Sequence, residues 1–418
     1  DHELDAWLNP TFFHAQDRGP AVAPAELARR LEASDPRLYV SYLPLAVEPG
    51  AAVDLFVTSR IPGVELPFNE VSLDPSSGRV LGRRQWGEAS LSRLNLLPFL
   101  YRFHYTLHLT DASGVGFGAL LMGVVALLWM LDAFFALYIS FPSWKVWRRS
   151  FAFRFGQGTH KLTFDLHRSS GVWLWPVLLV FALTAVSMNL GTELVRPVVQ
   201  LFSPLTPMPW QAPAIEPHEP RITRERAIEL AASLASEHGI DAPVGSLYYS
   251  PLQGYYALNF HRAGDAHGDG GLGNPQLFID ADTGAPIART LPNEGSAGDL
   301  FMRAQFPLHS GRIFGLLGRA TVSVLGVVIA MLSFTGVWLW AKKRIAHARR
   351  LAPRSSRIGK GTSRGNALAR HLFEQRLCVQ VAERSFDGGP TSGGENRARD
   401  RGGRPDRGSG DQAPGPSR

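Results

Sequence analysis

The chain has 418 residues, of which 43 are Lys or Arg and 36 are Asp or Glu, giving a formal net charge of +7. Its mean hydropathy is close to zero, at −0.04, but the apolar residues are concentrated in a few long stretches, which argues against an ordinary soluble protein. The single cysteine, Cys378, excludes a disulfide within one chain. The positive charge lies mainly beside the apolar stretches and in the tail, so we expect no nucleic-acid partner.

The first region of the chain, about residues 1–110, predicts a small α+β domain. Residues 24–35 have the pattern of a short helix, and alternating apolar residues in 37–59 predict strands. Within residues 74–81, Asp, Pro and Gly supply the turn of a hairpin between two further strands.

Three stretches are long and apolar enough to cross a bilayer as helices, because a span needs about 20 mostly apolar residues. Each has Trp or Tyr near an end, where amphipathic rings favour the headgroup region. The three predicted spans are Gly114–Ile139, Gly171–Leu190 and Ile313–Trp340.

Basic residues follow the first and third spans, beginning at Lys145 and at Lys342. By the positive-inside rule these two flanks are cytoplasmic. We therefore expect a lipid bilayer as the surroundings of the spans, residues 1–110 and 191–311 on the outer side, and the loop 142–165 and the tail on the inner side.

The second outer region repeats the plan of the first. Residues 223–238 predict a helix capped by Thr223, and two strands follow. Residues 276–287 repeat the pattern of strand, Asp turn, Gly and strand. In both regions a Leu-His dipeptide, ending at His108 or His309, follows the Asp turn about 30 residues later and precedes a span. The paired order indicates an internal duplication.

The second copy is also led by a span that opens with Asp165-Leu166-His167-Arg168. By the logic of duplication the first copy should have a matching helix upstream of Asp1, and residues 1–110 need some upstream segment to export them. The expected fold is therefore a membrane helical bundle, with three spans here and four in the intact protein, carrying two extracytoplasmic α+β domains.

These patterns divide the chain into seven segments. The tail is rich in Gly, Arg, Ser, Asp and Pro, so we expect it to be disordered. The segments are the first outer domain 1–103, a span 104–141, a basic inner loop 142–165, a span 166–191, the second outer domain 192–305, a span 306–344 and the tail 345–418.

Histidines at the membrane faces are the main candidate site residues. His108 and His309 occupy equivalent places in the repeat, and we predict that they are the axial ligands of one haem at the outer face. The alternative for each is an interfacial histidine that bonds water or headgroups. His104, one helical turn before His108, is a further candidate on the same face.

At the inner face, His167 is a candidate ligand whose partner would lie on the missing helix, and Arg168 is suited to a haem propionate or to a lipid phosphate. His160 could be placed like His167 if the helix begins early. Asp132 is an intramembrane carboxylate, and we favour for it a pairing with an inner-face cation such as Lys145 or Arg148 over a functional role.

Over about residues 1–345 the chain resembles the PepSY-associated transmembrane proteins, which are described as iron-regulated proteins of bacterial inner membranes. The resemblance implies PepSY-like outer domains, a multi-pass protein of the bacterial inner membrane, and up to two haem b groups. It is carried by four motifs, His2-Glu3-Leu4-Asp5-Ala6-Trp7-Leu8-Asn9-Pro10, Phe103-His104-Tyr105-Thr106-Leu107-His108, Asp165-Leu166-His167-Arg168 and Phe306-Pro307-Leu308-His309-Ser310-Gly311-Arg312.

Some members of this family look like haem-containing reductases of ferric siderophores, which implies electron transfer to ferric chelates in the periplasm. The sequence has no dinucleotide fingerprint and no phosphate loop, so the electrons would come from an unidentified cytoplasmic or membrane donor. One alternative is a non-catalytic PepSY regulator that binds a periplasmic protease or other partner. A metal or siderophore permease subunit is a third possibility and fits the nearly uncharged spans less well.

Overall fold

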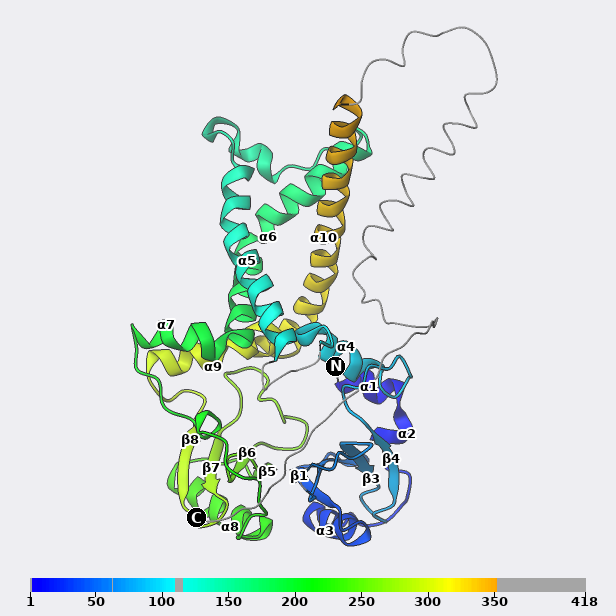
Figure 1. Cartoon of the computed structure of the whole chain (residues 1–418), viewed down its shortest axis with the longest axis vertical. Helices are drawn as coiled ribbons and strands as arrows, with labels where there is room; N and C mark the ends of the chain where they lie inside the picture. Colours follow the sequence, from blue (N-terminus) through cyan, green and yellow to red (C-terminus); the bar gives the residue numbers. More distant parts are fainter. Residues whose placement is uncertain (1, 62, 110–115, 352–418) are drawn as a thin grey trace, which may run out of the picture. The chain divides into compact units, whose positions relative to one another are not determined.

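The computed structural model describes residues 2–61, 63–109 and 116–351. Its strands form one antiparallel sheet in the order β4-β3-β2-β1-β5-β6-β7-β8 (Figure 1). The strands are β1 Leu38–Pro44, β2 Val53–Ser59, β3 Glu70–Leu73, β4 Val80–Arg84, β5 Val244–Ser250, β6 Tyr255–Phe260, β7 Gln276–Asp280 and β8 Pro286–Thr290. The helices longer than five residues are α1 His2–Leu8, α3 Pro24–Ser34, α4 Leu96–Thr106, α5 Phe117–Ser140, the 3₁₀ segment η1 Trp144–Phe151, α6 Thr159–Asn189, α8 Arg224–Glu237, α9 Ala297–Ser310 and α10 Gly315–Leu351.

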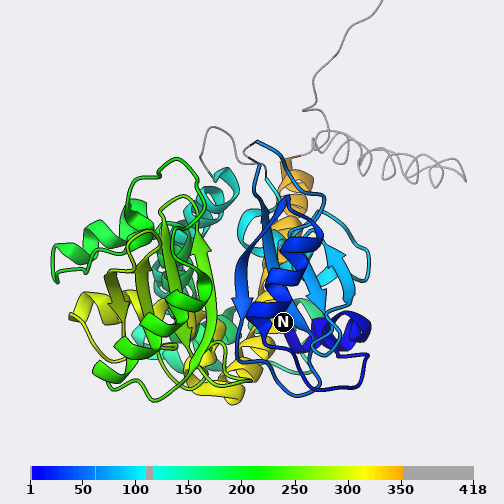
Figure 2. The ribbon, with the colours of Figure 1, turned by 90° about the horizontal axis from the view of Figure 1, so that it is seen from below.

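The sheet consists of two halves with the same element order, a helix followed by four antiparallel strands. One half contains α3 and β1 to β4, and the other contains α8 and β5 to β8. The sequence predicts two outer domains, whereas the structure joins the halves by pairing β1 with β5, with Tyr42 opposite Tyr248 and Leu43 opposite Leu247 (Figure 2). This pairing satisfies backbone groups that two separate domains would leave unpaired at their edges.

Each half has its own apolar core beneath its helix. In the first half Leu27 and Leu31 of α3 pack on the alternate, inward-facing residues of the strands, as the period of two predicts. In the second half Ala227 and Ala231 of α8 do the same, and their small side chains bring that helix close to the sheet.

An ion pair between the two halves reinforces the strand pairing. Arg224, at the start of α8, donates to Glu32 on α3 at 2.6 Å and to the carbonyl oxygen of Val40 at 2.9 Å. Both charged side chains are almost completely buried, so each needs an opposite charge nearby, and Arg60 adds a second, longer pair with Glu32 at 3.4 Å.

Among the described residues, three helices are long and apolar enough to cross a membrane, which agrees with the three predicted spans. They are α5, α6 and α10, within Phe117–Ser140, Thr159–Asn189 and Arg312–Arg350. Two of these helices extend beyond their predicted spans, because α6 begins at Thr159 and α10 continues as helix to Leu351. The first and third predicted segments, 104–141 and 306–344, begin too early, because α5 begins at Phe117 and α10 at Gly315. Gly114 and the tail from residue 352 lie outside the described residues.

The prediction that His108 and His309 lie on the spans themselves is wrong. His309 lies in the last turn of α9, and the chain then turns at Gly311, whose φ of 75° is left-handed, before α10 begins. In the first copy α4 ends at Thr106, and Leu107 and His108 both have positive φ, at 53° and 54°. Such angles are unfavourable for residues with a Cβ, so this corner is strained.

A glycine near the start of each following span allows these corners to pack tightly. A Cβ on Gly118 of α5 would lie 2.0 Å from the carbonyl oxygen of Thr106, and one on Gly318 of α10 would lie 2.0 Å from that of Gly311. Only glycine permits so close an approach. The two corners therefore share one feature, a glycine of the span that packs against a carbonyl oxygen of the preceding corner.

Ion pairs tie the sheet region to the beginning of α10. Asp269, in the glycine-rich loop of the second half, accepts from Arg312 at 2.6 Å and from Arg319 at 3.2 Å. Arg319 also pairs with Glu3 of α1. The corner after His309 is thereby held by both halves of the sheet region.

Candidate functional site

The helices α4 and α9 bring two histidines together at the end of the spans nearer the sheet (Figure 1). His104 and His309 each lie in the last turn of their helix, and their ring centroids are 6.2 Å apart with an interplanar angle of 43°. His104 is exposed, whereas His309 is half-buried. The residue that meets His309 is therefore His104, which lies one turn earlier than His108, the residue that the matching Leu-His dipeptides indicate.

His309 is held by the α6 span. Its Nδ1 lies 2.9 Å from Oγ1 of Thr184, and its ring lies against Phe181 with centroids 5.4 Å apart. Burial, with a smaller contribution from His104, lowers the pKa of His309 to about 4. The imidazole is therefore neutral at pH 7. Within the described residues, Nε2 of His309 and both ring nitrogens of His104 have no hydrogen-bond partner.

His108 is directed elsewhere. Its Nε2 bonds to the carbonyl oxygen of Phe99 at 3.0 Å, and its ring stacks on the Phe99 ring with centroids 4.7 Å apart. The left-handed corner at Leu107 and His108 turns this side chain back onto α4. The predicted pair of His108 and His309 is thus not the pair that the structure brings together.

His167 lies at the contact between α6 and α10 near the inner end of the spans. Its Nδ1 lies 3.0 Å from the carbonyl oxygen of Leu332 and 3.3 Å from Oγ1 of Thr335. Its ring packs on Gly336, and Nε2 has no hydrogen-bond partner among the described residues. His160, in the first turn of α6, is exposed.

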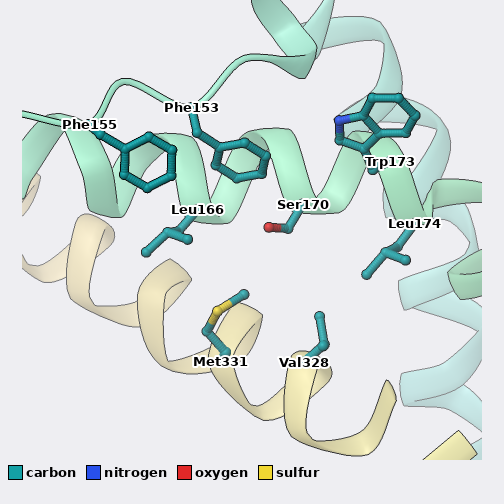
Figure 3. Close-up of a pocket in the computed structure, with 8 residues that line it drawn as sticks. All are labelled: Phe153, Phe155, Leu166, Ser170, Trp173, Leu174, Val328 and Met331. Carbon is teal, nitrogen blue, oxygen red and sulfur yellow. The ribbon is translucent and has the colours of Figure 1, made fainter. Parts of the chain in front are cut away.

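An apolar pocket of about 490 Å³ lies between α6 and α10, next to His167 along both helices (Figure 3). Leu166 and Met331, which line it, are the chain neighbours of His167 and of its acceptor Leu332. Ser170 is the one polar lining residue, and its hydroxyl points into the space. The lining residues are Phe153, Phe155, Leu166, Ser170, Trp173, Leu174, Val328 and Met331.

Asp165 anchors the inner loop beside this pocket. Its carboxylate is completely buried and accepts from the backbone and the guanidinium of Arg154 at 2.7 to 3.0 Å. Arg168 lies 3.4 Å from the same carboxylate and donates to the carbonyl oxygen of Arg149 at 2.6 Å. The guanidinium of Arg168 is thus part of a structural network, although its Nε has no partner within the described residues.

Sequence reasoning missed several of these residues. Thr184 and Thr335 contact the histidines. The available signal was a hydroxyl within an apolar span, but Ser187 and Ser333 carry the same signal nearby, so it does not single out these two residues. The sequence placed Asp165 in the motif that opens the second span and Arg154 in the basic loop before it, and it did not indicate that the two residues form a pair. Asp132 lies on an exposed face of α5, and the predicted pairing with Lys145 or Arg148 is not among the ion pairs of the described residues.

In the described part of the chain, none of the four candidate ligands His104, His108, His167 and His309 forms an ion pair with a carboxylate, whereas His218 lies 3.1 Å from Asp282. Among the described residues, no group of three or more His, Cys, Asp and Glu side chains could hold a metal ion. A metal at the outer pair would therefore need a group that supplies most of its ligands.

Comparison with known families gives one decisive observation, a match to the PepSY-associated TM region over residues 1–343. The chain belongs to this family. The match covers both halves of the sheet and nearly all of the three spans, and so confirms the resemblance drawn from the four motifs. A search of curated proteins gave no match. This PepSY-associated protein is thus a multi-pass membrane protein whose spans imply a lipid bilayer around them.

Proposed function

We propose that this PepSY-associated protein is a haem-dependent reductase of the bacterial inner membrane that moves electrons to ferric chelates, such as siderophores, in iron uptake. The observation that supports this most is the pair His104 and His309. An imidazole nitrogen binds a transition metal at about 2.0 Å, so two rings that hold one ion would have centroids no more than roughly 6 Å apart. The separation of 6.2 Å suits this arrangement.

Two histidines are sufficient for haem because the porphyrin supplies the remaining four ligands. His309 is neutral at pH 7 and so keeps the lone pair that a ligand needs. The exposed His104 leaves the site accessible from the outer side. These properties fit an outer haem b better than the pair of His108 and His309 expected from the sequence.

His167 would hold a second, inner haem, with the adjacent apolar pocket beside it and Arg168 near its charged edge. The described residues offer one histidine there, so the second ligand has to come from elsewhere. Both sites are linked by α6, because His167 and Thr184 are separated along this one helix by about 25 Å at 1.5 Å per residue. That distance is close to the thickness of a bilayer core.

When bound, haem supplies a one-electron carrier at each face. The chain itself holds the ligands, and the two halves of the sheet, which we take as the duplicated PepSY-like domains, form the outer region where a chelate would bind. Ferrous iron binds hard oxygen ligands more weakly than ferric iron does, so reduction would release it. The electrons would come from a separate cytoplasmic or membrane donor.

The first experiment is a visible spectrum of the oxidised and dithionite-reduced protein purified in detergent. We expect a six-coordinate b-type haem whose outer component is lost in His104→Ala and in His309→Ala. His108→Ala is the matched control and should retain it. A folded wild-type protein without haem would overturn the proposal and favour the regulatory alternative.

A second experiment tests the reaction. The dithionite-reduced protein, freed of excess reductant, is mixed with a ferric hydroxamate chelate and a ferrous-specific chromogenic chelator. We expect reoxidation of the haem together with formation of the coloured ferrous complex. If the haem stays reduced in the presence of the chelate, the protein binds haem but is not a reductase of ferric chelates, and that part of the proposal is wrong.

A further inference from the structure

We infer that Thr184 is a positioning residue of the outer site, which fixes His309 in the tautomer that leaves Nε2 unprotonated. The inference about the tautomer stands on the geometry of the protein alone. Only its consequence for ligation rests on the proposed function.

The hydroxyl of Thr184 already donates its hydrogen to the backbone of its own helix. Oγ1 lies 2.9 Å from the carbonyl oxygen of Val180 and 3.0 Å from that of Phe181, the usual back-bonding of Thr in a helix. A carbonyl oxygen can only accept, so Thr184 donates to the backbone of α6. Its oxygen is then an acceptor toward Nδ1 of His309, and that nitrogen must carry the proton.

Burial strengthens this assignment. Thr184 is 1% exposed, and the neutral imidazole has one proton to place. With Nδ1 as the donor, Nε2 keeps its lone pair free of any partner within the described residues. A buried hydroxyl oxygen with no donor would carry a desolvation penalty, so both groups favour the same tautomer.

The same arrangement, a back-bonded Thr beside Nδ1 of a histidine, occurs at His167. Thr335 donates to the carbonyl oxygens of Met331 and Leu332, and its oxygen lies 3.3 Å from Nδ1 of His167. The Leu332 carbonyl oxygen, 3.0 Å away, accepts from this nitrogen as well. In both places a back-bonded Thr on one helix orients a histidine on another helix. Repetition at two separate histidines indicates a common role rather than chance packing.

The consequence for ligation follows from the partner of the second ring nitrogen. An acceptor on Nδ1–H fixes the orientation of the ring and raises the basicity of the ligating nitrogen, and loss of such a partner typically lowers metal affinity 10- to 100-fold. Thr184 would therefore act on the bound metal through His309, without touching it.

The test compares Thr184→Val, which keeps the shape and loses the acceptor, with Thr184→Ser, which keeps it. Thr321→Val is the control, because Thr321 also back-bonds in its helix, to Leu317 at 2.8 Å, and contacts no histidine. In haem-free protein labelled with ¹⁵N-histidine, NMR reports which nitrogen of His309 is protonated. The signal is assigned by its absence in His309→Ala.

We expect Nδ1–H in the wild type, in Thr184→Ser and in Thr321→Val, and a mixture of tautomers in Thr184→Val. A wild-type His309 protonated at Nε2, or a Thr184→Val variant with an unchanged tautomer, would overturn the inference. Haemin titration is a separate readout, in which Thr184→Val should bind about 10- to 100-fold more weakly and Thr184→Ser like the wild type. If no variant binds haemin, the proposed function fails, while the NMR result still decides the role of Thr184.

Discussion

His167 on α6 packs directly on Gly336 of α10, where a Cβ would lie 2.9 Å from Cε1 of the imidazole. This approach places Nδ1 of His167 within hydrogen-bonding distance of the Leu332 carbonyl oxygen, one turn earlier on α10. The absence of a side chain at Gly336 is thus what allows the ring of His167 to lie in this position.

Gly336→Ala should displace the ring of His167 and destabilise the protein by about 1 to 3 kcal/mol, the usual cost of overpacking. Gly326→Ala is the control, since a Cβ there meets nothing within 4 Å and Ala is the better helix former. Thermal unfolding in detergent measures both. Equal unfolding temperatures in the two variants would show that the contact at Gly336 is not tight.

The ion pair between Glu32 and Arg224 should determine how firmly the two halves of the sheet are joined. Arg224→Gln leaves a buried carboxylate without its main partner and should cost about 3 kcal/mol. Arg226→Gln, which removes an exposed pair with Glu229, should change stability by less than about 0.5 kcal/mol. Thermal unfolding and limited proteolysis measure the difference. Similar behaviour of the two variants would mean that strand pairing alone joins the halves.

Asp54 on β2 should make the sheet region less stable at higher pH. Burial, opposed in part by the neighbouring Ser72 hydroxyl, raises the pKa of Asp54 to about 7, and its Oδ1 is buried without a partner among the described residues. The folded protein therefore holds a proton that the unfolded chain has released above about pH 4. Between these values stability falls as pH rises, by at most about 1.4 kcal/mol per pH unit.

Asp54→Asn should remove this dependence, so that its advantage over the wild type grows from pH 5 to pH 7 and then levels off. Asp35→Asn is the control, because Arg37 lowers the pKa of Asp35 to about 2 and its carboxylate is ionised throughout this range. Unfolding temperatures at several pH values test the pair. A constant offset for Asp54→Asn would show that Asp54 titrates normally.

The buried carboxylate of Asp165 should hold the inner loop in place. Asp165→Asn removes the charge that accepts the hydrogen bonds from Arg154 and should cost about 1.5 to 3 kcal/mol, the range for hydrogen bonds to a charged group. Tryptic cleavage after Arg154 should become faster. Asp132→Asn, on an exposed face of α5, is the matched control and should leave the cleavage rate unchanged. Equal rates in both variants would contradict the anchoring role.

The sequence by itself determined the three candidate spans, one helix and the strands in each half of the sheet, and the family. These features depend on local patterns of apolar residues, turn residues and motifs that are continuous along the chain. Spacing alone also predicted that His104, His108, His167 and His309 lie near the ends of the spans, and this prediction required no knowledge of packing.

Only the tertiary structure decided which histidines meet. A left-handed corner turns His108 back onto Phe99 and leaves His104 beside His309, and no periodicity predicts a pair of positive φ angles at residues with a Cβ. The joining of two predicted domains through β1 and β5, and the contact of Thr184 with His309, likewise depend on how distant segments pack. Such long-range contacts are set by the fit of whole surfaces, which is why local sequence patterns did not contain them.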